Sequence, residues 1–443
     1  MAGPTDAFEF VLATARRTLR QVDDDLRTAK PAPGRGQALA AHVTKTLGLI
    51  DSRVSTAAAA FPAAGLPQAQ EAIIRNLRLY TQLARALHLA LPWLDRDHRA
   101  RVDLGTDYFV DEMALALVGR GVETLVVPES EYMYSTLSWP FKIAALQYLK
   151  ADVATGVRPI VLFFPLKEAD SALLHVLFAH ELGHASVDEH DLVAQVVDPL
   201  KTEASYQQGL AAATTHIQSA FGWGPARAEA FAVARLRQWV EELLCDALAL
   251  QYLGPSYLFG FAAFVLASSW NDPQPQHPQP TLRVALLMEQ LRQLGWDHAI
   301  ETARPNLWAW FEWAEATPAP PLTDDNKFLA EMCDAQAATI RAVAAGRLGA
   351  NTYAPDAFSG QAEDLEARLA RRILPAETEV GPVDRRSVIL AAWLFALSRK
   401  PDGTPRTDGP IAFPEALAET GFQRFIAKAL ELSTVAEVWG ELP

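Results

Sequence analysis

The feature that most constrains the fold of this chain is a helical repeat of apolar residues. Near the N-terminus, apolar side chains recur at three- and four-residue steps: Phe8, Val11, Leu12, Ala15, Leu19 and Val22. This spacing predicts an amphipathic helix that buries one face. Further helical segments are expected at 37–60, 68–91, 226–253, 256–269, 281–293 and towards the C-terminus. We therefore expect a mainly α protein of the α+β class.

A small sheet is expected in the middle of the chain. Residues 123–128 and 158–165 form short β-branched and aromatic runs bounded by proline, which is typical of strands. Proline removes a backbone donor, so both strands are expected at sheet edges. Asp170 or Ser171 can then cap a helix over 172–186.

Proline-rich breaks suggest how the chain is divided. Pro92 ends the early helical pattern, the texture changes after Arg101, and residues 317–322 form the best linker candidate. We expect an N-terminal helical region over 1–100, a central domain over 101–316 and a C-terminal helical region over 323–443.

Charge and cysteine content narrow the possible partners and compartment. Lys and Arg total 39 against 53 Asp and Glu, a formal net charge of −14. An acidic chain lacks the basic surface that nucleic acids and anionic membranes require. Cys245 and Cys333 cannot build a disulfide framework, and Asp6 and Glu9 interrupt any leader pattern. A cytoplasmic location without a nucleic-acid partner is expected; the oligomeric state stays open.

An uncharged stretch at 247–271 is long enough to span a bilayer. Gly254 and Pro255 interrupt it, and both residues break helices. We predict two buried helices here, with a membrane span as the alternative.

The residues most informative about chemistry are His180-Glu181-Leu182-Gly183-His184, which form an H-E-x-x-H pattern inside a predicted helix. Positions four apart share one helical face, so both imidazoles can reach one zinc ion. From the edge of that face, Glu181 can take a proton from a water at the metal.

A catalytic zinc needs a third protein ligand. Glu242 and Asp246 share one face of a later helix, again four residues apart. Glu242 is the expected ligand, and Asp246 can hold the second ring nitrogen of a ligand histidine. Glu241 is the rival ligand. Further on, His277 or Arg283 can stabilise an oxyanion near the metal.

The order His-Glu-x-x-His, Glu-x-x-x-Asp and His-Pro-x-x-x-x-Arg resembles the gluzincin metallopeptidases, in particular the HtpX-like group that includes the CAAX prenyl proteases. The resemblance covers about 158–293. It implies a zincin-like core in which His180, His184 and Glu242 bind zinc, Glu181 is the general base and Asp246 supports a ligand. It also implies that Arg283 lies near the active site and that an edge strand over 158–165 holds extended substrate.

These observations predict a zinc-dependent endopeptidase with a single zinc ion per chain and a protein or peptide substrate of restricted range. The alternative is a metal-stabilised interaction protein without catalytic activity. The sequence does not specify the cleavage site or the role of the helical flanks.

Overall fold

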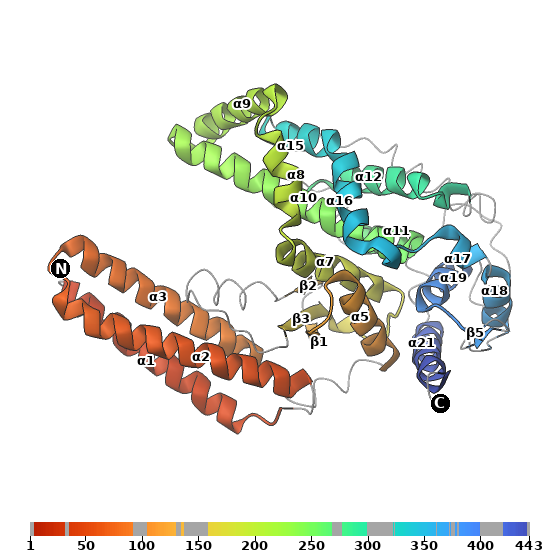
Figure 1. Ribbon diagram of the computed structural model, residues 1–443, viewed down its shortest axis with the longest axis horizontal. Helices are drawn as coiled ribbons and strands as arrows, with labels where there is room; N and C mark the ends of the chain where they lie inside the picture. The colour runs from red at the N-terminus through yellow and green to blue at the C-terminus, as the bar shows by residue number, and fades with distance from the viewer. Residues whose placement is uncertain are drawn as a thin grey trace. The chain divides into compact units, whose positions relative to one another are not determined.

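The computed structural model describes residues 4–31, 35–91, 104–129, 134–136, 158–267, 277–298, 322, 324–359, 361–371, 373, 377–378, 381–398 and 420–440. This part of the chain is mainly helical with a small sheet, which confirms the coarse fold prediction (Figure 1). Most of the linker candidate at 317–322 lies outside the described residues.

The chain forms two compact units. The first combines Met1–Arg101 with Arg120–Leu166, and the second combines Val102–Gly119 with Lys167–Pro443. These units run across the regions expected from sequence, because the strands belong to the first unit and the H-E-x-x-H residues to the second. The expected regions 1–100, 101–316 and 323–443 therefore stay predictions.

The first unit contains three long helices: α1 (Pro4–Thr28), α2 (Arg35–Ala60) and α3 (Pro67–Ala90). Each contributes an apolar stripe to one core, with Val22, Ile50 and Leu77 fully buried. The short 3₁₀ turn η1 (Phe61–Ala63) links α2 towards α3, and Phe61 stacks on Phe8 with ring centroids 3.7 Å apart. The apolar residues whose spacing predicted the amphipathic helix thus form the surface on which α1 packs against α2 and α3.

The sheet of the first unit has the strand order β1-β3-β2. Strand β1 (Val122–Glu129) runs parallel to β3 (Arg158–Pro165), and β2 (Ser135–Thr136) pairs antiparallel with β3. The prediction of an edge strand over 158–165 is therefore wrong, because β3 lies in the middle of the described sheet. Among the described residues, β2 pairs with Leu162 and Phe163 of β3, so no described strand needs a donor from Pro159 or Pro165 on that side.

The described part of the second unit is almost entirely helical. Its α-helices are α5 (Leu104–Leu117), α7 (Phe178–Glu189), α8 (Leu192–Leu200), α9 (Ala204–Phe221), α10 (Pro225–Leu253), α11 (Pro255–Ala267), α12 (Pro280–Gln293), α15 (Asp324–Ala335), α16 (Ala337–Leu348), α17 (Pro355–Ser359), α18 (Ala362–Ala370), α19 (Arg385–Ser398) and α21 (Thr420–Gly440). A two-stranded sheet pairs β4 (Glu377–Thr378) with β5 (Gly381–Pro382). The long helix α10 is the centre of this unit and packs on α7, α8, α9, α12 and α16 (Figure 1).

Helix α7 begins differently from the prediction. The expected helix over 172–186, capped by Asp170 or Ser171, is replaced by a 3₁₀ turn η5 (Leu174–Leu177) that leads into α7 at Phe178. The hydroxyl of Ser171 donates instead to Oε2 of Glu168 at 2.7 Å, and α7 has no side-chain cap. The 3₁₀ turn occupies residues where the α-helix was expected to begin, and the H-E-x-x-H residues still lie on α7.

The break between α10 and α11 confirms the prediction of two buried helices. Gly254 has φ +60°, and a Cβ at this position would come 2.9 Å from Cζ2 of Trp296. Only glycine combines this backbone conformation with so close a neighbour. Among the residues that the structure describes, no helix is both long and apolar enough to cross a membrane.

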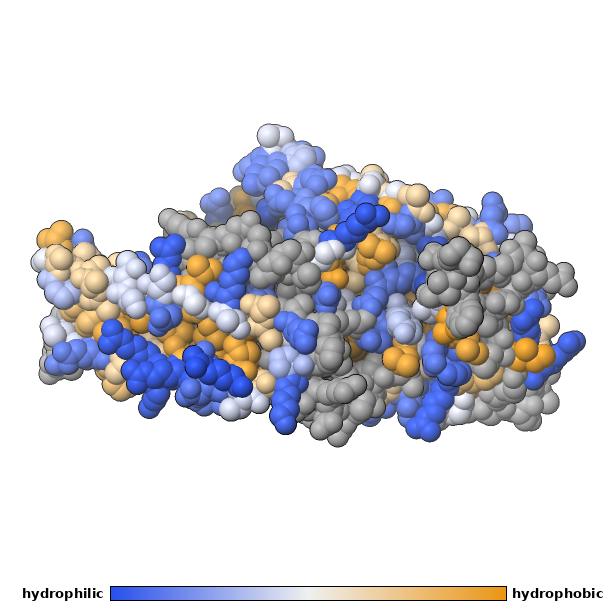
Figure 2. Space-filling model, turned by 60° about the horizontal axis from the view of Figure 1, so that its bottom comes forward, coloured by the Kyte–Doolittle hydropathy of each residue, from blue (hydrophilic) through white to orange (hydrophobic). Residues whose placement is uncertain are grey.

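On the face drawn in Figure 2, the coloured residues mix hydrophilic and hydrophobic side chains. Exposed large apolar residues of the chain include Phe10, Leu66, Leu115 and Phe221. Single exposed apolar residues are common on protein surfaces and define no site by themselves.

Candidate metal centre

Three side chains expected as metal ligands meet inside the second unit. His180 and His184 lie on α7, Glu242 lies on α10, and their ligand atoms are all within 4.8 Å of one another. The two imidazole centroids are 5.0 Å apart with ring planes at 89°. His180 is 8% exposed and Glu242 4%. This group could hold a metal ion.

The carboxylate of Glu242 lies between the two histidines. Its Oε2 is 3.3 Å from Nε2 of His180, and its Oε1 is 3.7 Å from Nε2 of His184. The buried Oε2 atom makes no well-aligned hydrogen bond among the described residues, although imidazole nitrogens of His180 and His277 lie 3.3 Å and 3.1 Å from it. A buried carboxylate oxygen is costly without a hydrogen bond or a cation. Two imidazole nitrogens and one carboxylate oxygen form a donor set that a divalent metal ion such as zinc accepts.

A carboxylate also holds the outer nitrogen of each histidine. Nδ1 of His180 lies 3.0 Å from Oδ1 of Asp246, and Nδ1 of His184 lies 2.9 Å from Oε1 of Glu241. Such contacts orient metal-binding histidines and place the proton on the nitrogen that faces away from the metal. Both Nε2 atoms are left to face Glu242.

Glu241 does not lie where the alternative third ligand was expected. Glu241 was the rival third ligand, but it is outside the three-residue group and contacts the outer side of His184. Adjacent helical residues point about 100° apart, so Glu241 and Glu242 cannot face the same point. Because the two glutamates are adjacent in a predicted helix, the sequence already indicated that Glu241 and Glu242 have different roles.

Arg283, on α12, is paired with Asp246. Its Nε and Nη2 atoms each donate to the Asp246 carboxylate at 2.7 Å, and its Nη1 lies 3.8 Å from Oε2 of Glu242. The guanidinium also lies 4.4 Å from the centroid of the Phe261 ring. Arg283 is thus near the centre, as expected, but its strongest contacts are with Asp246.

His277 lies beside Glu242. Its Nδ1 is 3.1 Å from Oε2 of Glu242, and its side chain is 40% exposed. Residues 272–276 of the proline-rich loop before it lie outside the described residues. His277 is therefore both close to the centre and open to solvent.

The electrostatic balance of the cluster favours a cation. Burial by itself would lower the pKa of His180, but Asp246 and Glu242 raise it to about 10. Burial by itself would raise the pKa of Glu242, but His180 and His277 hold it well below its usual range. The pKa of Asp246 is likewise lowered, against the effect of burial, by Arg283 and His180. The carboxylates are thus ionised and draw positive charge into the site, whether protons or a metal ion.

The close packing of α7 on α10 brings the ligands together. Gly183 lies against Cys245, and Glu181, 8% exposed, lies next to His180 on α7. The Cys245 thiol is fully buried, and burial raises its pKa well above the usual value. A protonated, buried thiol is a packing group rather than a ligand or nucleophile.

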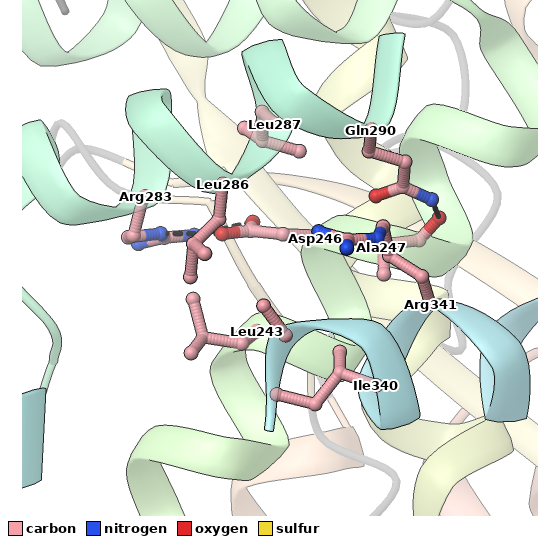
Figure 3. Close-up of a pocket in the computed structure, with 10 residues that line it drawn as sticks. Leu243, Asp246, Ala247, Arg283, Leu286, Leu287, Gln290, Ile340 and Arg341 are labelled. Carbon is pink, nitrogen blue, oxygen red and sulfur yellow. Dashed lines mark hydrogen bonds and ion pairs between the residues drawn. The ribbon is translucent and has the colours of Figure 1, made fainter. Parts of the chain in front are cut away.

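A small cavity lies beside the Asp246–Arg283 pair. Figure 3 shows these two residues with Gln290 and Arg341 among its walls. Its volume of about 20 Å³ has room for a water molecule but not for a substrate. Any substrate must therefore approach the ligands from another side.

Comparison of the chain with models of known protein families, with curated proteins and with solved structures found no match. A functional assignment therefore depends on the residues and geometry described above.

Proposed function

We propose that this protein is a zinc-dependent endopeptidase with a zincin-like core of the gluzincin type. The observation that supports it best is the group His180, His184 and Glu242, whose ligand atoms lie within 4.8 Å of one another beside Glu181. The pairing of each histidine with its own carboxylate adds support, because metal sites depend on such outer contacts.

In this proposal His180, His184 and Glu242 hold the ion. Bound zinc supplies a Lewis acid that lowers the pKa of a coordinated water towards neutrality. Glu181 accepts the proton of the attacking water and then donates it to the leaving amine, as a general base and general acid. Glu181 follows His180 directly on α7, and the rotation of a helix puts this position at the edge of the face that carries the two histidines.

His277 is the better candidate for stabilising the oxyanion. Arg283 is engaged by two hydrogen bonds to Asp246 and has 11% of its side chain exposed, whereas His277 has 40% exposed. We assign Arg283 the role of fixing Asp246, and His277 the role of a donor to substrate. The substrate is a protein or peptide of restricted range.

The competing function is a metal-stabilised interaction protein without turnover. Structural zinc sites are usually closed by four protein ligands and often use cysteine. Here the group of described residues has three members, and neither of the buried cysteines, Cys245 and Cys333, belongs to it. A group of three ligands would leave one position of a tetrahedral zinc for water, which favours chemistry over a structural site.

Zinc content per chain, measured by elemental analysis, tests the centre. We expect stoichiometric zinc in wild type, strongly reduced zinc in Glu242→Ala, and wild-type zinc in Glu289→Ala, an exposed glutamate on α12. Wild type should also cleave a small subset of a diverse peptide library, and a chelator should stop this. Absence of zinc under metal-replete conditions would refute the centre, and zinc without any hydrolysis would favour the interaction protein.

A further inference from the structure

Tyr257 is linked to the candidate metal centre through Asp246, on the side of His180 that faces away from Glu242. Its hydroxyl donates to Oδ1 of Asp246 at 2.5 Å and lies 3.3 Å from Nδ1 of His180. Its ring is parallel to that of His180, with an interplanar angle of 4° and centroids 6.4 Å apart. The hydroxyl is therefore placed at the junction between His180 and its supporting carboxylate.

The turn between α10 and α11 creates this contact. Gly254 ends α10 with a positive φ, and α11 starts at Pro255 and returns Tyr257 to the face of α10 that carries Asp246. Tyr257 and Asp246 are eleven positions apart, so the contact depends on this reversal. Tyr257 is 0% exposed and cannot reach a substrate.

The chemistry of the junction selects one proton position on His180. An ionised carboxylate only accepts hydrogen bonds, so the tyrosine hydroxyl must donate to Asp246. Arg283 donates twice to the same carboxylate, which holds both of its oxygens in place. Oδ1 then faces Nδ1 of His180 as an acceptor, and the tautomer with a proton on Nδ1 leaves Nε2 free to bind a metal.

We propose that Tyr257 is a positioning residue of the metal centre: its hydroxyl fixes the Asp246 oxygen that orients His180. The inference rests on the metal-holding part of the proposed function and does not depend on peptidase activity. Because Arg283 still holds Asp246 when the hydroxyl is absent, Tyr257→Phe should fold and leave a measurable, weaker site.

The test compares Tyr257→Phe with Tyr252→Phe by competition titration with zinc and by the visible absorption spectrum of the Co²⁺-substituted protein. Tyr252 is a matched control, because it is 2% exposed and its hydroxyl donates to Glu112 at 3.3 Å, away from the ligands. We expect zinc affinity to fall roughly 10-fold in Tyr257→Phe only. The Co²⁺ spectrum should change in that variant alone, while both variants lose similar thermal stability.

Equal zinc affinity and an unchanged Co²⁺ spectrum in Tyr257→Phe would overturn the positioning role and leave the proposed function intact. An equal loss of affinity in both variants would show a general effect of stability and also overturn it. Wild type that binds zinc but cleaves nothing would refute the peptidase alone. Wild type that binds neither Zn²⁺ nor Co²⁺ would refute the metal centre and this role together.

Discussion

Gly183 lies directly against the backbone of Cys245. A Cβ atom at position 183 would come 2.9 Å from Cα and 3.0 Å from Cβ of Cys245, closer than real side chains approach. Gly183 stands between the two histidine ligands on α7, and Cys245 stands three residues after Glu242 on α10. The distance between α7 and α10 at this point therefore determines how far the imidazoles of His180 and His184 lie from the Glu242 carboxylate.

Gly183→Ala should thus weaken metal binding by moving α7 away from α10. We expect a loss of about 1–3 kcal/mol in the free energy of unfolding from overpacking, together with reduced zinc affinity. Gly346→Ala is the control, because a Cβ there meets no atom within 4 Å and it lies within α16. The control should raise the free energy of unfolding by about 0.5–1 kcal/mol. Denaturant unfolding and zinc titration measure both effects, and wild-type zinc affinity in Gly183→Ala would contradict this account.

Glu181→Gln should retain zinc and lose turnover. Glutamine keeps the size of the side chain but cannot accept the proton of the attacking water. We expect peptide hydrolysis to fall by roughly 10²–10⁴-fold, the usual contribution of general acid–base catalysis. Elemental analysis and a peptide-cleavage assay on the same sample separate the two properties. A normal rate in this variant would exclude Glu181 as the base.

Asp246→Asn should affect both stability and metal binding. It removes the buried negative charge that pairs with Arg283, whose guanidinium then stays buried without its partner. Breaking a buried ion pair on one side typically costs about 3–5 kcal/mol in the free energy of unfolding. Zinc affinity should fall by about 10–100-fold, because the variant offers Nδ1 of His180 no charged acceptor and keeps a single acceptor oxygen for His180, Arg283 and Tyr257 together.

The more exposed pair Asp384–Arg386 provides the comparison for that variant. Its side chains are 26% and 19% exposed, so solvent screens them better. Asp384→Asn should therefore cost less stability and leave zinc affinity unchanged. Similar zinc affinity in Asp246→Asn and wild type would show that Asp246 does not support the ligand.

His175 should make the protein sensitive to acid. The side chain is 1% exposed, and burial lowers its pKa from 6.5 to about 4, against a hydrogen bond to the backbone of Ala169. Above the unfolded pKa both states are neutral and the stability is fully present. As the pH falls below 6.5, His175 becomes protonated in the unfolded chain but stays neutral in the folded chain. The free energy of unfolding therefore decreases until the pH reaches about 4.

The expected loss from His175 is about 3 kcal/mol in the free energy of unfolding between about pH 7.5 and pH 4. His175→Gln cannot titrate but keeps a hydrogen-bonding side chain, so its stability should fall less over that range. Denaturant unfolding of both proteins at several pH values gives the difference. Parallel pH dependence in wild type and variant would show that His175 takes up its proton in the folded state.

The helices and the spacing of the candidate ligands could be predicted from the sequence because they depend on neighbouring residues. The apolar steps of α1 and the break at Gly254 are local patterns, and both appear in the structure. His180 and His184 share a face because one turn of helix separates them. The strand over 158–165 was located correctly, but its place in the sheet was not, because strand order depends on pairing with distant residues.

The sequence by itself thus indicated most of the long helices, such as α1, α2, α3 and α10, and which residue types could bind a metal. Only the tertiary structure decided that Glu242 joins the two histidines while Glu241 holds the outer nitrogen of His184. It also decided that Arg283 and Tyr257 meet on Asp246. The reason is physical: these contacts join separate helices, so they depend on how α7, α10, α11 and α12 are rotated and packed, and side-chain packing sets that geometry rather than local spacing.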